Sequence, residues 1–160
     1  MQSLPMAPVA HNSSPAYSGE VVIVEIGGRL FGIDTAVIKS ISELALTDER
    51  LIVEPYFGSY LYQNTKIPLL NLADFFSLNT ALPETVFIVV VSAEVPFAIL
   101  ASRLLGKFRS EQTFALPQEA FRYPQLYPFA FEFNGSHLLL IDVHRALQYM
   151  TQHVQALGQL

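Results

Sequence analysis

The sequence lacks cysteine entirely and has few charged residues, which make up 14% of its 160 positions. Without cysteine, disulfide bonds, thiolate metal sites and cysteine nucleophiles are all excluded, and a reducing compartment is the simplest match. Acidic residues outnumber basic ones, giving a formal net charge of −5, and the nine lysines and arginines are scattered singly. A nucleic-acid binder needs clustered basic residues to neutralise phosphates, so the sequence argues against nucleic acid as a partner.

Long hydrophobic runs are also absent. The longest unbroken apolar run, residues 86–91, is far shorter than the roughly 20 residues that a membrane-spanning helix needs. Residues 1–19 have neither the basic start nor the long apolar middle of a secretory signal, and their proline, serine and alanine content predicts a flexible leader. We therefore expect a cytoplasmic protein with no direct membrane insertion.

Recognisable catalytic and metal-binding patterns are missing as well. The stretch GGRLFG, which begins at Gly27, lacks the Lys-Ser/Thr ending of a phosphate loop and favours a hairpin turn. His137, Asp142 and His144 are the best candidates for a metal or base site, but their spacing matches no metal-ligand pattern. No serine lies in a turn of the kind that activates a nucleophile. The sequence therefore predicts no catalytic residue, no metal site, no cofactor and no enzyme.

What the sequence does contain is apolar material, at 51% hydrophobic residues, arranged in short runs typical of β-strands. In the first half we expect a hairpin around Gly27 and Gly28, a short turn capped by Asp34, and a second hairpin over residues 56–72 with its turn at 63–66. Asn71 is expected to begin one helical turn, and residues 77–84 read as a linker.

The second half opens with residues 85–91, whose β-branched apolar run predicts a strand buried on both faces. Residues 110–128 contain three prolines and are expected to be irregular. An Asn134-Gly135 turn predicts a further hairpin, and a helix should follow Asp142. Its apolar stripe favours packing on the protein's own body over binding a partner, and it consists of Leu147, Met150, Val154 and Leu157.

The two halves of the sequence also echo each other. A shift of about 66 residues lays RLFGIDTAVI over VPFAILASRL, and a shift of about 71 lays IPLLNLADFF over LLLIDVHRAL. The order of expected elements suggests two small β units of about five strands each, over residues 20–80 and 84–150, packed as one body. Barrel-like closure would cover the exposed edges of such short strands.

Three stretches carry a resemblance to a known family: VVIVEIGGRLFGIDTAVIKSI, YFGSYLYQNTKIPLLNL and FAFEFNGSHLLLIDVHRAL. In this order and at these separations they resemble the CheW-like family, the coupling adaptors of bacterial chemosensory arrays, over roughly residues 20–150. Gly58, Pro68 and Leu72 fall at the family's spacing. The sequence departs from the family's pattern at several positions, where it has Ser40, Gln63 and Asn64 (for Arg-Gly), Asn71, Ala98, Ser102 and Phe129.

The resemblance implies a mainly β fold of two five-stranded SH3-like barrels that share a hydrophobic core, with short helices and a C-terminal helix ending in the tail 151–160. It implies a non-catalytic adaptor that couples a CheA-type histidine kinase to the cytoplasmic tips of chemoreceptors. By position in the family's motifs, the partner-binding residues would be Ile38, Ile41, Tyr60, Tyr62, Gln63 and Asn64. For the tyrosines and the turn, ordinary strand packing and turn formation remain an equal alternative.

Two other functions stay open at this point. One is a divergent interaction module that serves another pathway, for instance pilus-linked motility. The other is a small-molecule-binding β protein that uses the groove between the two units, for which an enclosed apolar pocket with converging polar groups would be required.

Overall fold

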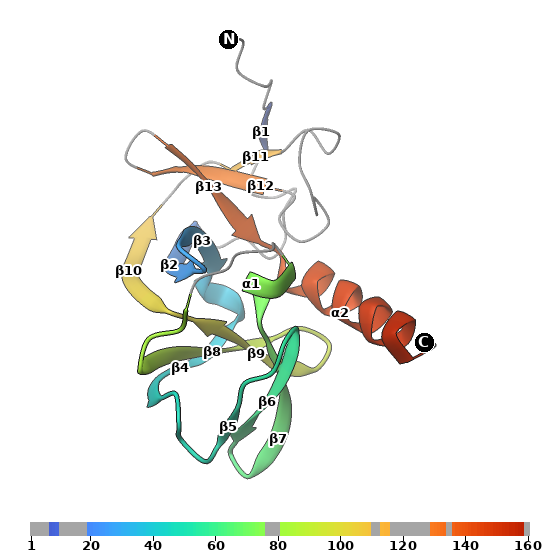
Figure 1. Ribbon diagram of the computed structural model, residues 1–160. Coiled ribbons are helices and arrows are strands. Elements are labelled where there is room, and N and C mark those ends of the chain that lie inside the picture. Colours follow the sequence, from blue (N-terminus) through green and yellow to red (C-terminus); the bar gives the residue numbers. More distant parts are fainter. Residues whose placement is uncertain are drawn as a thin grey trace.

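The computed structural model describes residues 7–9, 19–75, 81–109, 113–115, 129–133 and 136–158. Two β-sheets form the body, one above the other in Figure 1, and the C-terminal helix α2 (Val143–Gly158) extends from their side. The seven-stranded sheet has the order β1-β11-β12-β13-β3-β2-β10, and the six-stranded sheet has the order β4-β8-β9-β7-β6-β5. The mainly β fold with short helices is confirmed.

Each sheet contains five longer strands. In the seven-stranded sheet they are β12 (Phe129–Phe133), β13 (Ser136–Ile141), β3 (Arg29–Asp34), β2 (Glu20–Ile26) and β10 (Arg103–Arg109). In the six-stranded sheet they are β4 (Ile38–Ala45), β8 (Thr85–Ser92), β9 (Pro96–Ala101), β7 (Thr65–Leu70) and β6 (Phe57–Tyr62). The short strands β1 (Ala7–Val9), β11 (Thr113–Ala115) and β5 (Leu51–Ile52) add at the ends.

The two sheets are built from the same parts in the same order. In the seven-stranded sheet, the central hairpin β2–β3 pairs through β2 with antiparallel β10 and through β3 with parallel β13. In the six-stranded sheet, the central hairpin β8–β9 pairs through β8 with antiparallel β4 and through β9 with parallel β7. Each hairpin pairs with strands from the other half of the sequence. Both sheets therefore cross the division at residues 80–84, and neither half of the chain forms a sheet by itself.

The register of the parallel pairs reproduces the sequence shifts. Leu140 of β13 lies opposite Gly32 of β3, and Leu69 of β7 lies opposite Ala98 of β9. The shift of 66 carries Gly32 onto Ala98, and the shift of 71 carries Leu69 onto Leu140. The internal echo in the sequence is therefore an internal symmetry of the fold.

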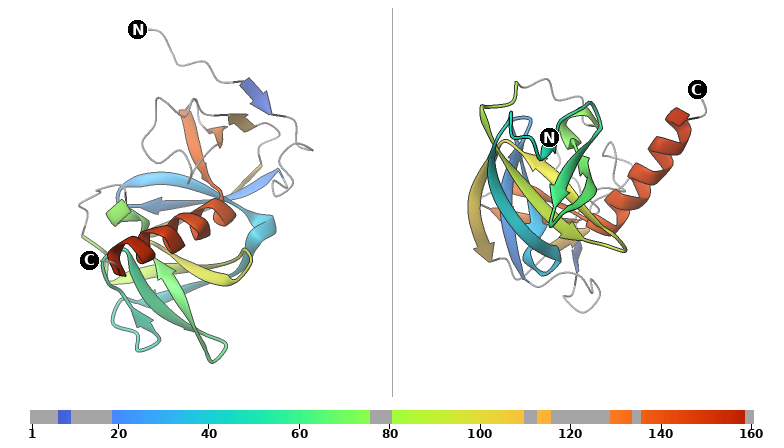
Figure 2. Two further views of the ribbon diagram at one scale, coloured as in Figure 1. Left: turned by 90° about the vertical axis from the view of Figure 1, so that its right-hand side faces the viewer. Right: turned by 90° about the horizontal axis from the view of Figure 1, so that it is seen from below.

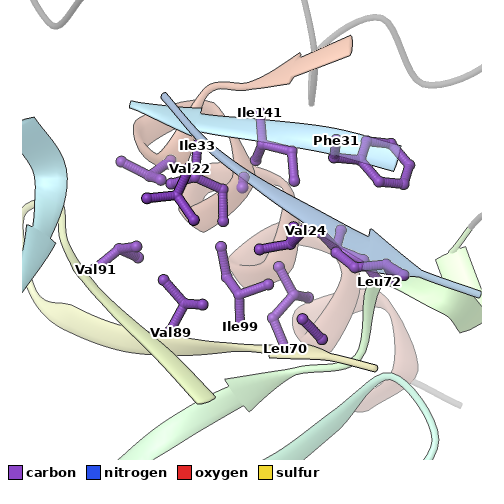
Figure 3. Close-up of a cluster of buried hydrophobic side chains, with 14 of the residues drawn as sticks. Val22, Val24, Phe31, Ile33, Leu70, Leu72, Val89, Val91, Ile99 and Ile141 are labelled. Atoms are coloured by element: carbon purple, nitrogen blue, oxygen red, sulfur yellow. The ribbon is translucent and has the colours of Figure 1, made fainter. Parts of the chain in front are cut away.

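One hydrophobic cluster lies between the two sheets and joins them, so the predicted shared core is confirmed. Figure 3 shows side chains from both sheets and from α1 (Leu72–Phe75) converging on it, among them Val22, Phe31 and Ile99. A second cluster fills the interior of the six-stranded sheet. Strand β8 contributes Val89 to the shared cluster and Ile88 to the second, as expected of a strand that is buried on both faces.

Capping side chains end the strands where the sequence indicated. The Ala36 N–H donates to Asp34 Oδ1 at 2.8 Å and starts the short 3-10 helix η2 (Thr35–Val37), after which β4 begins. The Arg145 N–H donates to Asp142 Oδ1 at 3.0 Å at the start of α2. Ala146 on this helix is buried in the shared cluster, and Leu147 packs against it. Of the apolar stripe predicted to pack on the body, Leu147 does so, and the side chains of Met150, Val154 and Leu157 lie outside the description.

Some expectations lie outside the described residues or differ from the structure. The turn at Asn134-Gly135 is not described, but β12 and β13 pair with Phe133 opposite Ser136, as a two-residue turn requires. Residues 113–115 were expected to be irregular and instead form β11, because pairing with β1 and β12 supplies their hydrogen bonds. No helix in the described ranges is long and apolar enough to cross a bilayer.

Candidate partner-binding surface

The six candidate residues lie on two strands of one sheet. Ile38 and Ile41 are on β4, at one edge of the six-stranded sheet, and the others are on β6 and the turn that follows it. Strands β8, β9 and β7 separate β4 from β6 in the order of the sheet. The fold therefore presents the candidates as two places, an edge strand and a hairpin tip.

The edge strand β4 carries a bulge and an exposed apolar residue. The register with β8 shifts between Ile38 and Ser40, which places Lys39 in the bulge. Ile38 is half-buried against the shared core, whereas Ile41 is 36% exposed. The Ser40 hydroxyl is buried and has no hydrogen-bond partner among the described residues. Ile41 is thus the part of β4 that a partner could cover.

The hairpin tip is a tight two-residue turn. Tyr62 of β6 pairs with Thr65 of β7, and the two residues between them, Gln63 and Asn64, have φ angles of 48° and 63°. Two successive positive φ angles are the mark of the primed turns that join twisted antiparallel strands, and glycine or asparagine is favoured there. The positive φ angle at position 64 therefore favours glycine there, and asparagine is the residue that can best replace it. Both side chains are exposed.

The two tyrosines pack inward from the hairpin. The Tyr60 side chain is only 4% exposed and belongs to the interior cluster of the six-stranded sheet, against which Tyr62 packs in turn. Their ring centroids are 6.4 Å apart with an interplanar angle of 30°. Tyr60 therefore supports the hairpin from inside and offers little surface to a partner, while Tyr62 is half-buried.

A charged turn that the sequence did not single out lies beside the hairpin. The Leu61 N–H donates to the Arg50 carbonyl oxygen at 2.9 Å, which ties residues 48–50 to β6. Arg50 donates from its side chain to both carboxylate oxygens of Asp48, at 3.0 Å each, and from its backbone N–H at 2.9 Å. These side-chain bonds, followed by the backbone bond, lower the pKa of Asp48 to about 2.

A second tie holds the chain just before β6. Tyr56 has a φ of 66°, which is unusual for a bulky residue. Its N–H donates to Asp74 Oδ2 at 2.8 Å, and its carbonyl oxygen accepts from the Asn71 N–H at 2.9 Å. Helix α1 thus fixes the strained residue and, through it, the start of the hairpin.

Two observations on the described residues concern the metal and small-molecule alternatives. No group of three potential ligands gathers in the described ranges, and His144 is exposed on the first turn of α2. The side chain of His137 lies outside the description. A recess lined by residues such as Gly27, Asn71 and Ser102 has a volume of about 10 Å³, room for about one water molecule. Ligand pockets are typically about 300 Å³ or more.

The sequence matches the CheW-like domain over residues 20–150. The chain belongs to the CheW-like domain family. Among solved structures, it is similar to the scaffolding protein TtCheW from Thermoanaerobacter tengcongensis, with a TM-score of 0.63 and 11% identity over 79% of this chain and 90% of that one. At that identity the likeness supports the fold alone. A comparison with curated proteins gave no match.

Since the chain belongs to the CheW-like family, its differences from the family's sequence pattern at the hairpin can be compared with the structure. Gln63 and Asn64 stand where the family's Arg-Gly pair is expected, and both have positive φ angles. What this CheW-like chain lacks at the tip is the charge of the arginine. Lys66, on the neighbouring strand and opposite Leu61, is the cation that this hairpin itself carries.

Proposed function

We propose that this chain is a non-enzymatic cytoplasmic adaptor that couples a CheA-type histidine kinase to the cytoplasmic tips of chemoreceptors. The observation that carries the proposal is the family match, which extends over residues 20–150 and includes both sheets.

The proposed contact uses exposed apolar side chains and the hairpin tip. Ile41 on β4 and Leu61 on β6 are 36% and 41% exposed, and Gln63 and Asn64 project from the turn between β6 and β7. Covering isolated apolar side chains of this kind suits a transient contact of about 1,000 Å² or less per partner. Ile38, Tyr60 and Tyr62 would shape this surface from beneath.

Restoring the family's arginine tests the proposal directly. Binding of the full chain to the kinase and receptor encoded by the same organism is measured by calorimetry, with Gln63→Arg beside the natural sequence. We expect Gln63→Arg to strengthen binding about 3-fold to 10-fold, the scale of one charge-assisted contact. Thr65→Arg is the matched control, because it adds the same charge one residue beyond the turn, and it should leave affinity unchanged.

The opposite result would support a different role. If neither the natural chain nor Gln63→Arg binds the kinase or the receptor while both remain folded, the adaptor proposal is wrong. The departures at positions 63, 64 and 71 would then mark a CheW-like interaction module that serves another pathway, such as pilus-linked motility. Equal strengthening by Thr65→Arg would show that added charge, and not the family position, is responsible.

A further inference from the structure

By the internal symmetry of the fold, strand β10 is the counterpart of β4, and the sequence motifs do not reveal this. Strand β10 ends the seven-stranded sheet as β4 ends the six-stranded sheet, and each pairs with one strand of a central hairpin. The register of β10 shifts between Leu104 and Gly106, which places Leu105 in a bulge. The shift of 66 residues carries Lys39, in the bulge of β4, onto Leu105. The protein therefore has two equivalent bulged edges.

The two edges differ in charge. Strand β10 contains Arg103, Lys107 and Arg109, three of the nine basic residues of the whole sequence, within seven positions. All three are exposed, and Leu105 between them is 42% exposed. The equivalents of Lys107 and Arg109 on β4 are Ile41 and Glu43. One edge is thus apolar with mixed charge, and the other is basic in a protein whose net charge is negative.

Ion pairs within the sheet do not cancel the charge of β10. Arg103 pairs with Glu25 at 3.3 Å and Arg109 with Glu20 at 3.9 Å, both on the neighbouring strand β2. The two arginine side chains remain 67% and 84% exposed, and pairs at such exposed sites are weak. Lys107 makes no ion pair with any residue in the described ranges.

Strand β10 forms one edge of the seven-stranded sheet as described. Among the described strands it pairs with β2 alone, and Figure 1 shows it curving along the outer side of the molecule. In the right-hand view of Figure 2 it lies at the periphery of the sheets. A strand at the edge of a sheet can act as a template for an added strand, and alternating side chains then set specificity.

We propose that β10 is a docking edge for an extended acidic segment of a partner protein, which adds to the seven-stranded sheet beyond β10. Acidic side chains at alternate positions would face Lys107 and Arg109, and an apolar side chain would cover Leu105. This inference rests on the symmetry, the edge position and the charge of β10, and it does not depend on the kinase and receptor proposed above. It makes the protein an adaptor with two equivalent edges that select partners by charge.

The test uses labelled peptides of about eight residues, a length typical of strands. One peptide alternates valine with glutamate and the other alternates valine with lysine. Fluorescence anisotropy with the full chain should show binding of the glutamate peptide, weakening as salt rises from about 50 mM to about 300 mM, and no binding of the lysine peptide. Equal binding of both peptides, or of neither, overturns the proposal.

Variants locate the site. The double substitution Lys107→Glu with Arg109→Glu should weaken binding of the glutamate peptide about 10-fold or more. If the charge reversal unfolds the protein, the milder double substitution Lys107→Gln with Arg109→Gln replaces it. This variant should weaken binding of the glutamate peptide about 3-fold. Lys39→Glu is the matched control on the equivalent edge β4, and it should change the affinity by less than about 2-fold. Weakening of the same size by Lys39→Glu would overturn the assignment to β10.

Two further measurements separate edge addition from its rivals. Hydrogen exchange should slow for backbone amides of β10 in the presence of the glutamate peptide and stay unchanged for β4. Slowing at β4 alone, or none anywhere, contradicts strand addition. If β10 binds an acidic partner segment and not a second copy of the chain, sedimentation of the chain alone should show a monomer. Self-association that disappears in the double variant would mean that β10 binds a second copy, which overturns the acidic-partner proposal.

Discussion

At the scale of single residues, Gly58 shows how closely two strands approach before the hairpin turn. A Cβ atom at this position would overlap the carbonyl oxygen of Ile52 on β5 and lie 3.2 Å from the Glu54 nitrogen. Backbone atoms cannot move aside as a flexible side chain can. We predict that Gly58→Ala lowers the free energy of unfolding by about 1 to 3 kcal/mol, the usual cost of overpacking, measured by urea denaturation.

Ser59→Ala is the matched control for this substitution, because Ser59 neighbours Gly58 on the same strand and its hydroxyl makes no hydrogen bond with any residue in the described ranges. Its effect should stay within about 0.5 kcal/mol. If Gly58→Ala proved equally harmless, β5 would have to shift freely away from β6. In that case the pairing of Ile52 with Ser59 would contribute little to stability.

Asp48 gives a second residue-scale prediction, through its pKa. The side chain and then the backbone N–H of Arg50 hold the pKa of Asp48 at about 2, below the value of about 3.9 in an unfolded chain. A carboxyl with a lowered folded-state pKa stabilises the fold above the unfolded pKa. We therefore expect this contribution to be complete above about pH 4 and to be lost as the pH falls towards 2.

The measurement is an NMR titration of the Asp48 carboxyl carbon. In Arg50→Gln the guanidinium bonds are lost while the backbone N–H at position 50 remains, so the pKa should rise without returning fully to 3.8. Lys39→Gln removes a cation elsewhere and should leave the titration unchanged. An Asp48 pKa close to the unfolded value in the natural chain would show that the Asp48–Arg50 bonds do not persist in solution.

At the scale of elements, the turn between β6 and β7 has good geometry but less than ideal residues. Gln63 and Asn64 both adopt positive φ angles, which cost free energy for any residue except glycine. Asn64→Gly should therefore stabilise the hairpin, raising the free energy of unfolding by about 0.5 to 1 kcal/mol in urea denaturation. Thr65→Gly is the control, because Thr65 begins the extended strand β7, where glycine only adds flexibility to the unfolded chain and should destabilise.

The elements divide clearly into those that the sequence revealed and those that it did not. Strand β8 and the hairpin β6–β7 were predictable because apolar runs and turn residues are local signals. Strand β10 was missed because its three cations and its glycine weaken the local strand signal, and pairing with the distant strand β2 stabilises it. At the candidate site, motif position led to β4 and the hairpin tip, but not to the burial of Tyr60 or the turn at Asp48 and Arg50. Those features depend on contacts between distant parts of the sequence.

At the scale of the whole molecule, folding requires both halves of the sequence, because strands of each half pair with strands of the other. Within the first half, the hairpin β2–β3 would lose its partners β10 and β13, and β4 would lose β8. What remains is the hairpin β2–β3, the small unit β5-β6-β7 and β4 without its partner. An isolated hairpin is marginally stable in water. The sequence shifts match the register of the two parallel strand pairs. They could not reveal that strands of one half pair with strands of the other, because pairing within each half would preserve the same sequence similarity.

Separating the halves tests this architecture. Fragments 1–80 and 81–160, prepared alone, should each lack cooperative thermal unfolding by circular dichroism, because neither contains a complete sheet. Mixed in equal amounts, they should form a one-to-one complex on size-exclusion chromatography and regain a cooperative transition, since the shared hydrophobic cluster draws on both fragments. A fragment that folded cooperatively by itself would show that its strands can pair within one half. The two halves would then be independent domains. The equivalence of β4 and β10 would no longer depend on the pairing of strands between the two halves.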